Sequence, residues 1–146
     1  MQDTHTSTMS SGSKDSMTET RHYRTANPYE LEFGYSRAVR KGPFITVSGT
    51  TSTSPLTGVV QHPDSAYEQT RTTFAEIITA IEALGGAKAD VVRLRMFVKK
   101  EQDAGDVSRA LKEVFGEVAP AATMVFGMTF VNPDMRVEIE ADAIVL

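Results

Sequence analysis

Several residue types and patterns are missing from this 146-residue sequence, and their absence limits its chemistry. There is no cysteine, which excludes thiol catalysis, disulfides and cysteine-ligated metals. The histidines His5, His22 and His62 are scattered, and no two have the spacing of metal ligands. No serine has a histidine partner in a recognisable nucleophile motif, and no glycine-rich phosphate loop is present. We therefore expect no metal site.

Long apolar runs are also missing. No stretch approaches the roughly 20 apolar residues that a membrane-spanning helix needs. The N-terminus lacks the apolar centre of a secretory signal. The formal net charge of −4 makes nucleic acid a poor partner, because an acidic surface repels phosphate. We expect a cytoplasmic protein with neither membrane nor nucleic-acid partners.

The first 22 residues differ in composition from the rest of the chain. They are mostly serine, threonine and other polar residues with almost nothing to bury. We predict a disordered tail over 1–22 and one domain over 23–146. Met17 is an alternative start of the natural domain, and the sequence does not decide between these beginnings.

Hydrophobic periodicity predicts elements in the order β-β-α-β-α-β-β. The longer helix starts at an Asp64-Ser65 cap and ends at Gly85-Gly86. The shorter helix runs over about 107–115. The predicted strands are 35–39, 44–48, 91–98, 122–130 and 136–145.

This order predicts an α+β fold in which both helices cover one face of a mixed sheet. So small a domain has no further element to cover the other face. Self-association is the economical way to cover it, and closed symmetric assemblies are the usual outcome.

Four segments together resemble the YjgF/RidA family. They are GYSRAVRKGPFITVSG (34–49), EALGG (82–86), DVVRLRMFVK (90–99) and PAATMV followed by VEIEADA (120–125 and 137–143). Each is short and apolar, but their order and spacing span roughly the last 118 residues. The resemblance implies a chorismate-mutase-like fold and a homotrimer with clefts at the subunit interfaces.

The resemblance also implies a chemistry. Well-studied members hydrolyse enamines and imines derived from amino acids, releasing ammonia and a 2-keto acid, without a metal or organic cofactor. Their strand tyrosine matches Tyr35, their water-activating glutamate matches Glu138, and the backbone of their binding loop matches Ser48 and Gly49.

One family position departs from the pattern. Members with this activity grip the substrate carboxylate with an arginine in Pro-Ala-Arg-Ser, and here that arginine is replaced by Ala122, followed by Thr123. Alanine offers neither charge nor donor, whereas a guanidinium binds a carboxylate through a rigid fork. Either the substrate lacks that carboxylate, another residue holds it, or the chemistry is lost.

Arg37 is the alternative anchor. It lies two residues after Tyr35, so both side chains of a regular strand share one face. A second candidate group is Glu138, Glu140 and Asp142, which alternate along one face of the last strand. We expect Glu138 to activate water and the other two to form ion pairs with Arg93, Arg95 or Arg136.

Met124 and Phe126 share a face with Ala122 if their strand is regular. Core packing is the ordinary interpretation of such residues. The alternative is that they line a larger and more apolar cleft, suited to an aromatic or bulky ligand. Thr50 and Thr123 would donate hydroxyl hydrogen bonds in that cleft.

We predict an enamine- or imine-deaminase-like hydrolase whose small-molecule substrate lacks the carboxylate or is bulky and apolar. A non-catalytic ligand-binding or chaperone-like trimer is one alternative. An accessory enzyme of a specialised biosynthetic pathway is another. The acidic charge balance and the lack of a histidine pair weigh against a ribonuclease.

Overall fold

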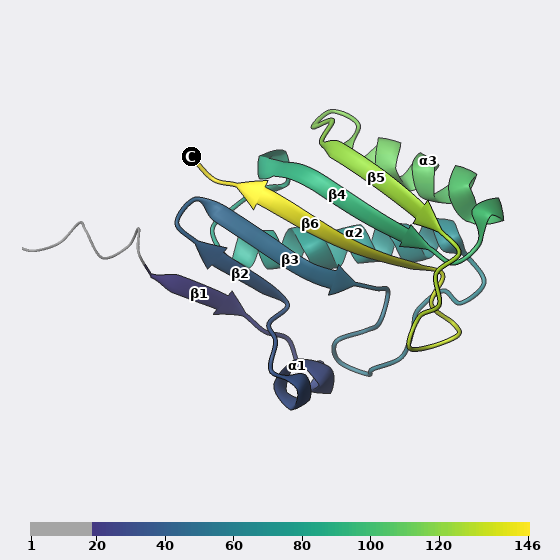
Figure 1. Cartoon of the computed structure of the whole chain (residues 1–146), viewed down its shortest axis with the longest axis horizontal. Helices are drawn as coiled ribbons and strands as arrows, with labels where there is room; N and C mark the ends of the chain where they lie inside the picture. The colour runs from purple at the N-terminus through teal and green to yellow at the C-terminus, as the bar shows by residue number, and fades with distance from the viewer. Residues whose placement is uncertain (1–18) are drawn as a thin grey trace, which may run out of the picture.

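The computed structural model describes residues 19–146, which form one mixed sheet with helices packed on it (Figure 1). The sheet order is β1-β2-β3-β6-β4-β5, and only β4 and β5 are parallel. The strands are β1 (Thr20–Tyr23), β2 (Ala38–Lys41), β3 (Phe44–Thr50), β4 (Val91–Val98), β5 (Ala121–Phe126) and β6 (Val137–Ile144). The helices are α1 (Pro28–Phe33), α2 (Ala66–Ala83) and α3 (Ala104–Phe115), with short 3₁₀ turns at Lys88–Asp90 and Glu101–Asp103.

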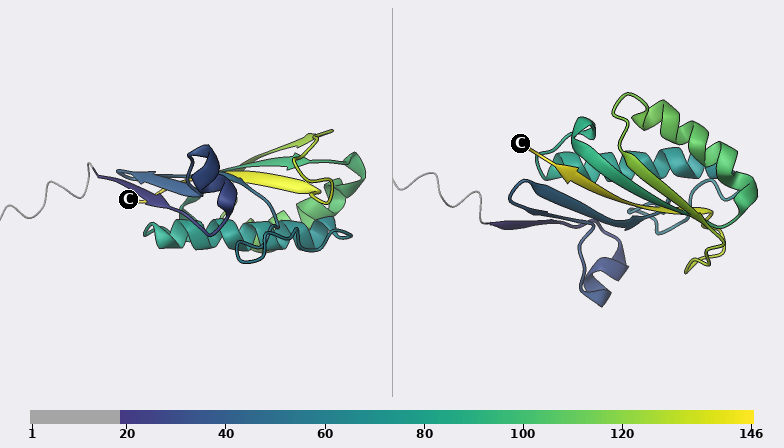
Figure 2. Two further views of the ribbon diagram at one scale, coloured as in Figure 1. Left: turned by 90° about the horizontal axis from the view of Figure 1, so that it is seen from below. Right: turned by 45° about the horizontal axis from the view of Figure 1, so that its top comes forward.

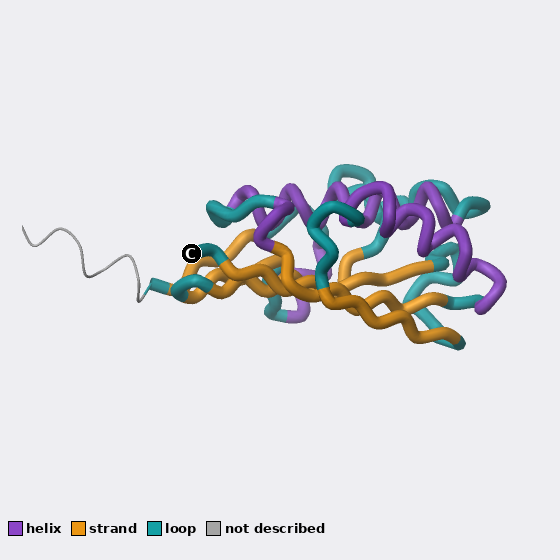
Figure 3. Tube along the Cα trace, turned by 90° about the horizontal axis from the view of Figure 1, so that it is seen from above, coloured by secondary structure: helices purple, strands orange, loops and turns teal. Residues whose placement is uncertain are grey.

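Both long helices lie on the same face of the sheet, as predicted (Figure 2, Figure 3). Ser65 caps α2 by accepting a hydrogen bond from the Glu68 amide at 3.1 Å. Phe74 of α2 meets Phe115 of α3 edge to face, with ring centroids 4.9 Å apart. Apolar side chains of β3, β4 and β6 complete the core beneath them. The predicted α+β class, a mixed sheet with both long helices on one face, is confirmed.

Among residues 19–146, neither long helix lies on the opposite face of the sheet, which carries charge (Figure 3). Arg95 on β4 forms ion pairs with Glu140 at 3.4 Å and Asp142 at 3.1 Å on β6. The predicted ladder is therefore confirmed for Arg95. Arg93 instead donates to Thr123, and Arg136 pairs with Asp103.

The N-terminal boundary was predicted wrongly. Thr20–Tyr23, assigned in part to a tail over 1–22, forms strand β1 on the edge of the sheet beside β2. Its backbone hydrogen bonds, an Arg21 contact to the Leu84 carbonyl and the packing of Tyr23 against the core hold it. Its other three residues are exposed, so hydrophobic patterning misses it. Residues 1–18, including Met17, lie outside the described residues.

Helix α1 was also missed, because six residues are too few to show a helical period. Local signals explain it: Asn27 caps the first turn, Pro28 follows, and Gly34 ends the helix at φ 78°. The strand predicted from Tyr35 consequently begins at Ala38. The strand predicted over 122–130 ends at Phe126, where Gly127 has φ 81°.

Candidate functional site

A pocket of about 470 Å³ opens at the end of β3, between α1 and the loops that follow β3 and β5. Four of the sequence-predicted site residues line it: Tyr35, Arg37, Gly49 and Glu138. The remaining lining residues are Asn27, Tyr29, Phe33, Thr51, Thr53, Gly58, Val60, Val131, Asn132 and Met135.

Glu138 enters the pocket from the start of β6. A bulge in β3 between Val47 and Thr50 brings Gly49 directly against its carboxylate. A Cβ at position 49 would lie only 2.2 Å from Glu138 Oε1, so the approach requires glycine. Within residues 19–146, no group donates a hydrogen bond to this carboxylate and no cation pairs with it. Its acceptor oxygens are therefore available to a ligand or water.

Burial raises the pKa of the Glu138 carboxyl above its ordinary value. The nearby Arg37 guanidinium acts in the opposite direction and lowers that pKa, while the negative charge of Glu140 raises it. A carboxyl tuned in this way suits a group that takes up and returns a proton.

Arg37 lines the pocket and is held there by several groups. Its Nη1 donates to the Gly49 carbonyl at 3.0 Å, and its guanidinium lies 5.7 Å from the centroid of the Tyr35 ring. Its Nε is 3.8 Å from Glu30 Oε2, which is an ion pair but too long for a hydrogen bond. Nη2 donates to none of the described residues, so one side of the fork is available.

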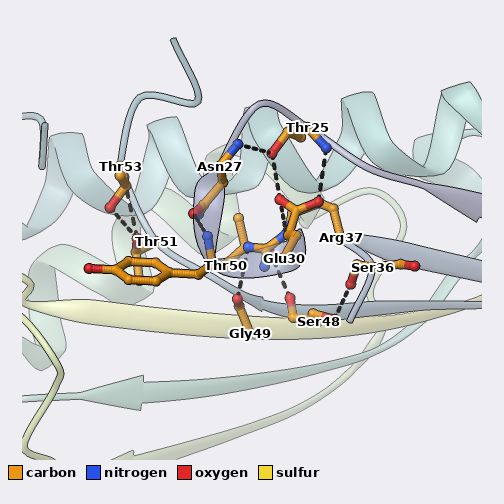
Figure 4. Close-up of polar contacts among 11 residues, drawn as sticks. Thr25, Asn27, Glu30, Ser36, Arg37, Ser48, Gly49, Thr50, Thr51 and Thr53 are labelled. Carbon is orange, nitrogen blue, oxygen red and sulfur yellow. Dashed lines mark hydrogen bonds and ion pairs between the residues drawn. The ribbon is translucent and has the colours of Figure 1, made fainter. Parts of the chain in front are cut away.

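Glu30 links Arg37 to helix α1 (Figure 4). Although charged, it is 1% exposed and is the one buried residue of that helix. The Thr25 amide donates to Glu30 Oε1 at 2.9 Å, and the Thr25 hydroxyl donates to Oε2. These contacts and the Asn27 cap fix α1 beside the pocket.

Ser48 and Thr50 were predicted to bind substrate, but neither lines the pocket. The Ser48 hydroxyl donates to the Ser36 carbonyl at 2.7 Å. The Thr50 hydroxyl, in a residue only 2% exposed, donates to the Ser48 carbonyl at 2.8 Å. Their side chains hold the β3 bulge together, and only Gly49 between them reaches the pocket.

The predicted site residues of β5 do not line this pocket. Two strands, β6 and β4, separate β5 from β3, a distance of roughly 14 Å across the sheet. Ala122, Met124 and Phe126 share one face, because they pair with Leu94, Met96 and Val98 of β4. That is the helix-covered face, and Met124 packs against the core, as in the ordinary interpretation of methionine. Thr123 points to the opposite face.

Sequence reasoning missed the aromatic wall of the pocket. Tyr29 and Phe33 sit one turn apart on α1, with ring centroids 5.9 Å apart. The Asn27-Pro28 start signal followed by two aromatic residues at i and i+4 is the pattern that would have found them.

Within residues 19–146, no three or more His, Asp or Glu side chains gather closely enough to hold a metal ion. None of the helices over this range has the length and apolarity to cross a bilayer.

Comparison with known proteins gives a consistent result. The family model described as Endoribonuclease L-PSP matches residues 26–145. An uncharacterized protein of Streptomyces coelicolor is 31% identical over 123 residues, covering 84% of this chain and 90% of its own. A Salmonella typhimurium 2-iminobutanoate/2-iminopropanoate deaminase is 30% identical over 113 residues, covering 75% of this chain and 86% of its own.

Solved structures agree with the sequence relatives. A Mycobacterium tuberculosis member of the YjgF/YER057c/UK114 family superposes with a TM-score of 0.78 at 34% identity, covering 87% of this chain and all of its own. The Escherichia coli YjgF protein superposes with a TM-score of 0.73 at 28% identity, covering 85% of this chain and 98% of its own.

Proposed function

We propose, because this chain belongs to the YjgF/RidA family, that it hydrolyses small imines or enamines to carbonyl compounds and ammonia. The observation that carries the proposal is the Glu138 carboxylate. It faces a pocket, has acceptor oxygens not used by any described residue, and shares the pocket with Tyr35 and Arg37. The Salmonella relative named as a deaminase supports the reaction class.

In the proposed reaction, ionised Glu138 accepts a proton from a water molecule as the water oxygen bonds to the imine carbon. The electron pair of the C=N bond moves to nitrogen, which takes this proton from Glu138, so that a neutral carbinolamine forms. Glu138, ionised again, then accepts the carbinolamine hydroxyl proton and passes it to the nitrogen. The C=O bond forms as the C–N bond breaks, and ammonia leaves. Tyr35 orients the substrate beside Glu138.

Arg37 takes the place of the arginine missing at Ala122. Arg37 lines the same pocket as Glu138, and its Nη2 donates to none of the described residues, so it binds a substrate carboxylate while Glu138 acts at the adjacent carbon. The Gly49 carbonyl and Glu30 already occupy part of the guanidinium. Arg37 therefore binds a carboxylate more weakly than an arginine without such partners would.

The chain is further proposed to act as a homotrimer. The sheet face opposite the long helices exposes apolar side chains among the described residues, including Phe44 on β3 and Val125 on β5. Covering them is favourable. In a closed assembly, the Ala122, Thr123, Met124 and Phe126 edge of one copy would border the pocket of the next. Light scattering should give three times the mass of a single chain. A monomer at micromolar concentration would contradict the assembly.

The reaction is tested with imines generated in situ from amino acids by an amino-acid oxidase, following ammonia release above the rate in buffer. Glu138→Gln should reduce the rate by about 10²- to 10⁴-fold. Glu140→Gln, on the same strand but ion-paired with Arg95, is the matched control and should retain activity at neutral pH. No acceleration with any imine, or full activity in Glu138→Gln, would contradict the proposal.

A non-catalytic ligand-binding trimer is the second candidate, favoured by Ala122 in place of the family arginine. In that case small amphipathic ligands raise the melting temperature equally in the wild type and in Glu138→Gln. A ligand-induced shift that disappears in Glu138→Gln would count against it.

A further inference from the structure

Helix α1 exposes two aromatic rings at the edge of the candidate site. Tyr29 is 50% exposed and Phe33 67% exposed, and both line the pocket that contains Arg37 and Glu138. The ring centroids are 5.9 Å apart with an interplanar angle of 21°, so the two rings are stacked and together form an aromatic wall.

Helix α1 has attachments that do not involve these rings. The helix is attached through buried Glu30, which binds Thr25 and pairs with Arg37. It starts at the Asn27 cap and ends at Gly34 in the left-handed region. The exposed surfaces of the two rings are left available, and an apolar ligand group is a natural partner for them.

The pocket therefore combines three chemically different features. Arg37 supplies a positive charge with a donor that no described residue uses, Glu138 supplies a carboxylate, and α1 supplies an aromatic wall. A substrate with a carboxylate, an adjacent imine and an aromatic side chain complements all three. About 470 Å³ is also within the usual range of small-molecule sites and far larger than a three-carbon imino acid requires.

We infer that the site is specific for imines or enamines of aromatic amino acids, with the substrate ring stacked on Tyr29 and Phe33. This inference rests on the proposed function. Arg37 binds the carboxylate, Glu138 acts at the imine carbon, and the side chain extends toward α1. Contact with the aromatic wall supplies affinity that the missing arginine does not supply.

The experiment compares the imine of phenylalanine with the imine of alanine, both generated by an amino-acid oxidase. The wild type should have the higher kcat/KM with the phenylalanine imine. Phe33→Leu and Tyr29→Leu remove the ring but keep an apolar helix-forming side chain. Each should lower kcat/KM for the aromatic imine by about 2- to 12-fold, mainly through KM, and leave the alanine imine unchanged.

Leu31→Ala is the matched control. Leu31 lies on the same helix, is 86% exposed and does not line the pocket. Its substitution should change neither substrate. Equal losses on both imines in Phe33→Leu, or a preference for the alanine imine in the wild type, would overturn the inference while leaving the proposed hydrolysis intact. A change of oligomeric state in Phe33→Leu would also overturn it, because the rings would then belong to an interface between copies.

The inference remains testable if no imine is hydrolysed. Phenylpyruvate and pyruvate share the carboxylate and carbonyl and differ in the ring. The difference between their affinities, measured by calorimetry, therefore reports the contribution of the aromatic wall to binding. Phenylpyruvate should bind more tightly, and Phe33→Leu should remove much of that difference. Equal affinities for the two acids would overturn the aromatic specificity whatever the reaction is.

Discussion

Replacing Gly49 with alanine should impair the site without unfolding the protein. The new Cβ would lie 2.2 Å from Glu138 Oε1 and 3.1 Å from its Cδ, whereas ordinary contact begins at 3.4 Å. The carboxylate must therefore move by about 1 Å. A displacement of that size at a reacting group costs about 10²-fold in rate.

The cost in stability should be small by comparison. The obstructing atoms are the end of a flexible side chain, so Glu138 can turn away at about 0.5–1.5 kcal/mol of rotamer strain. Position 49 does not have the positive φ that would strain an alanine backbone. We expect kcat for imine hydrolysis to fall by about 10²-fold while the free energy of unfolding, measured in urea, falls by about 1 kcal/mol.

Gly105→Ala is the matched glycine control, because nothing lies within 4 Å of the new Cβ in helix α3. It should retain activity and gain about 0.4–1 kcal/mol of stability. In a Glu138→Gln background, Gly49→Ala should cost no further rate, because the group it displaces is already gone. Wild-type kcat in Gly49→Ala, or fully additive losses in the double variant, would refute a catalytic role for the position of Glu138.

Three further predictions concern charge and the attachment of α1. The rate of hydrolysis should rise with pH as Glu138 ionises through its raised pKa. Arg37→Gln should move this rise in rate to higher pH, and Glu140→Gln should move it to lower pH. pH–rate profiles that shift the same way in both variants would contradict the assigned causes. Because the pKa of Glu138 is raised in the folded state, the unfolded chain ionises first, and stability is lost as pH rises from the ordinary carboxyl pKa to the raised one. Glu138→Gln should therefore be more stable than the wild type at neutral pH, and the difference should shrink in acid. A difference in melting temperature that does not depend on pH would be inconsistent with this. Asn27→Ala should remove the α1 cap, lower the free energy of unfolding by about 1 kcal/mol and speed amide exchange in α1. Protection factors unchanged from the wild type would show that Glu30 alone holds the helix.

Much of the fold was predictable because its signals are local and periodic. The caps and apolar positions of α2 and the alternation of β4 and β6 follow from side-chain periodicity and survive in the structure. β1 and α1 were not predictable in this way. One is held by backbone pairing with β2, and the other by a buried charge, Glu30.

The candidate site was likewise predictable only in part. The sequence by itself identified Tyr35, Arg37, Gly49 and Glu138 as candidates and Ala122 as the departure from the family. Only the tertiary structure decided that the first four share one pocket, that Ser48 and Thr50 have hydroxyls used in the β3 bulge, and that the apolar wall comes from α1. The physical reason is that these relationships depend on the bulge, on sheet order and on one buried ion pair, which join residues that no sequence period relates.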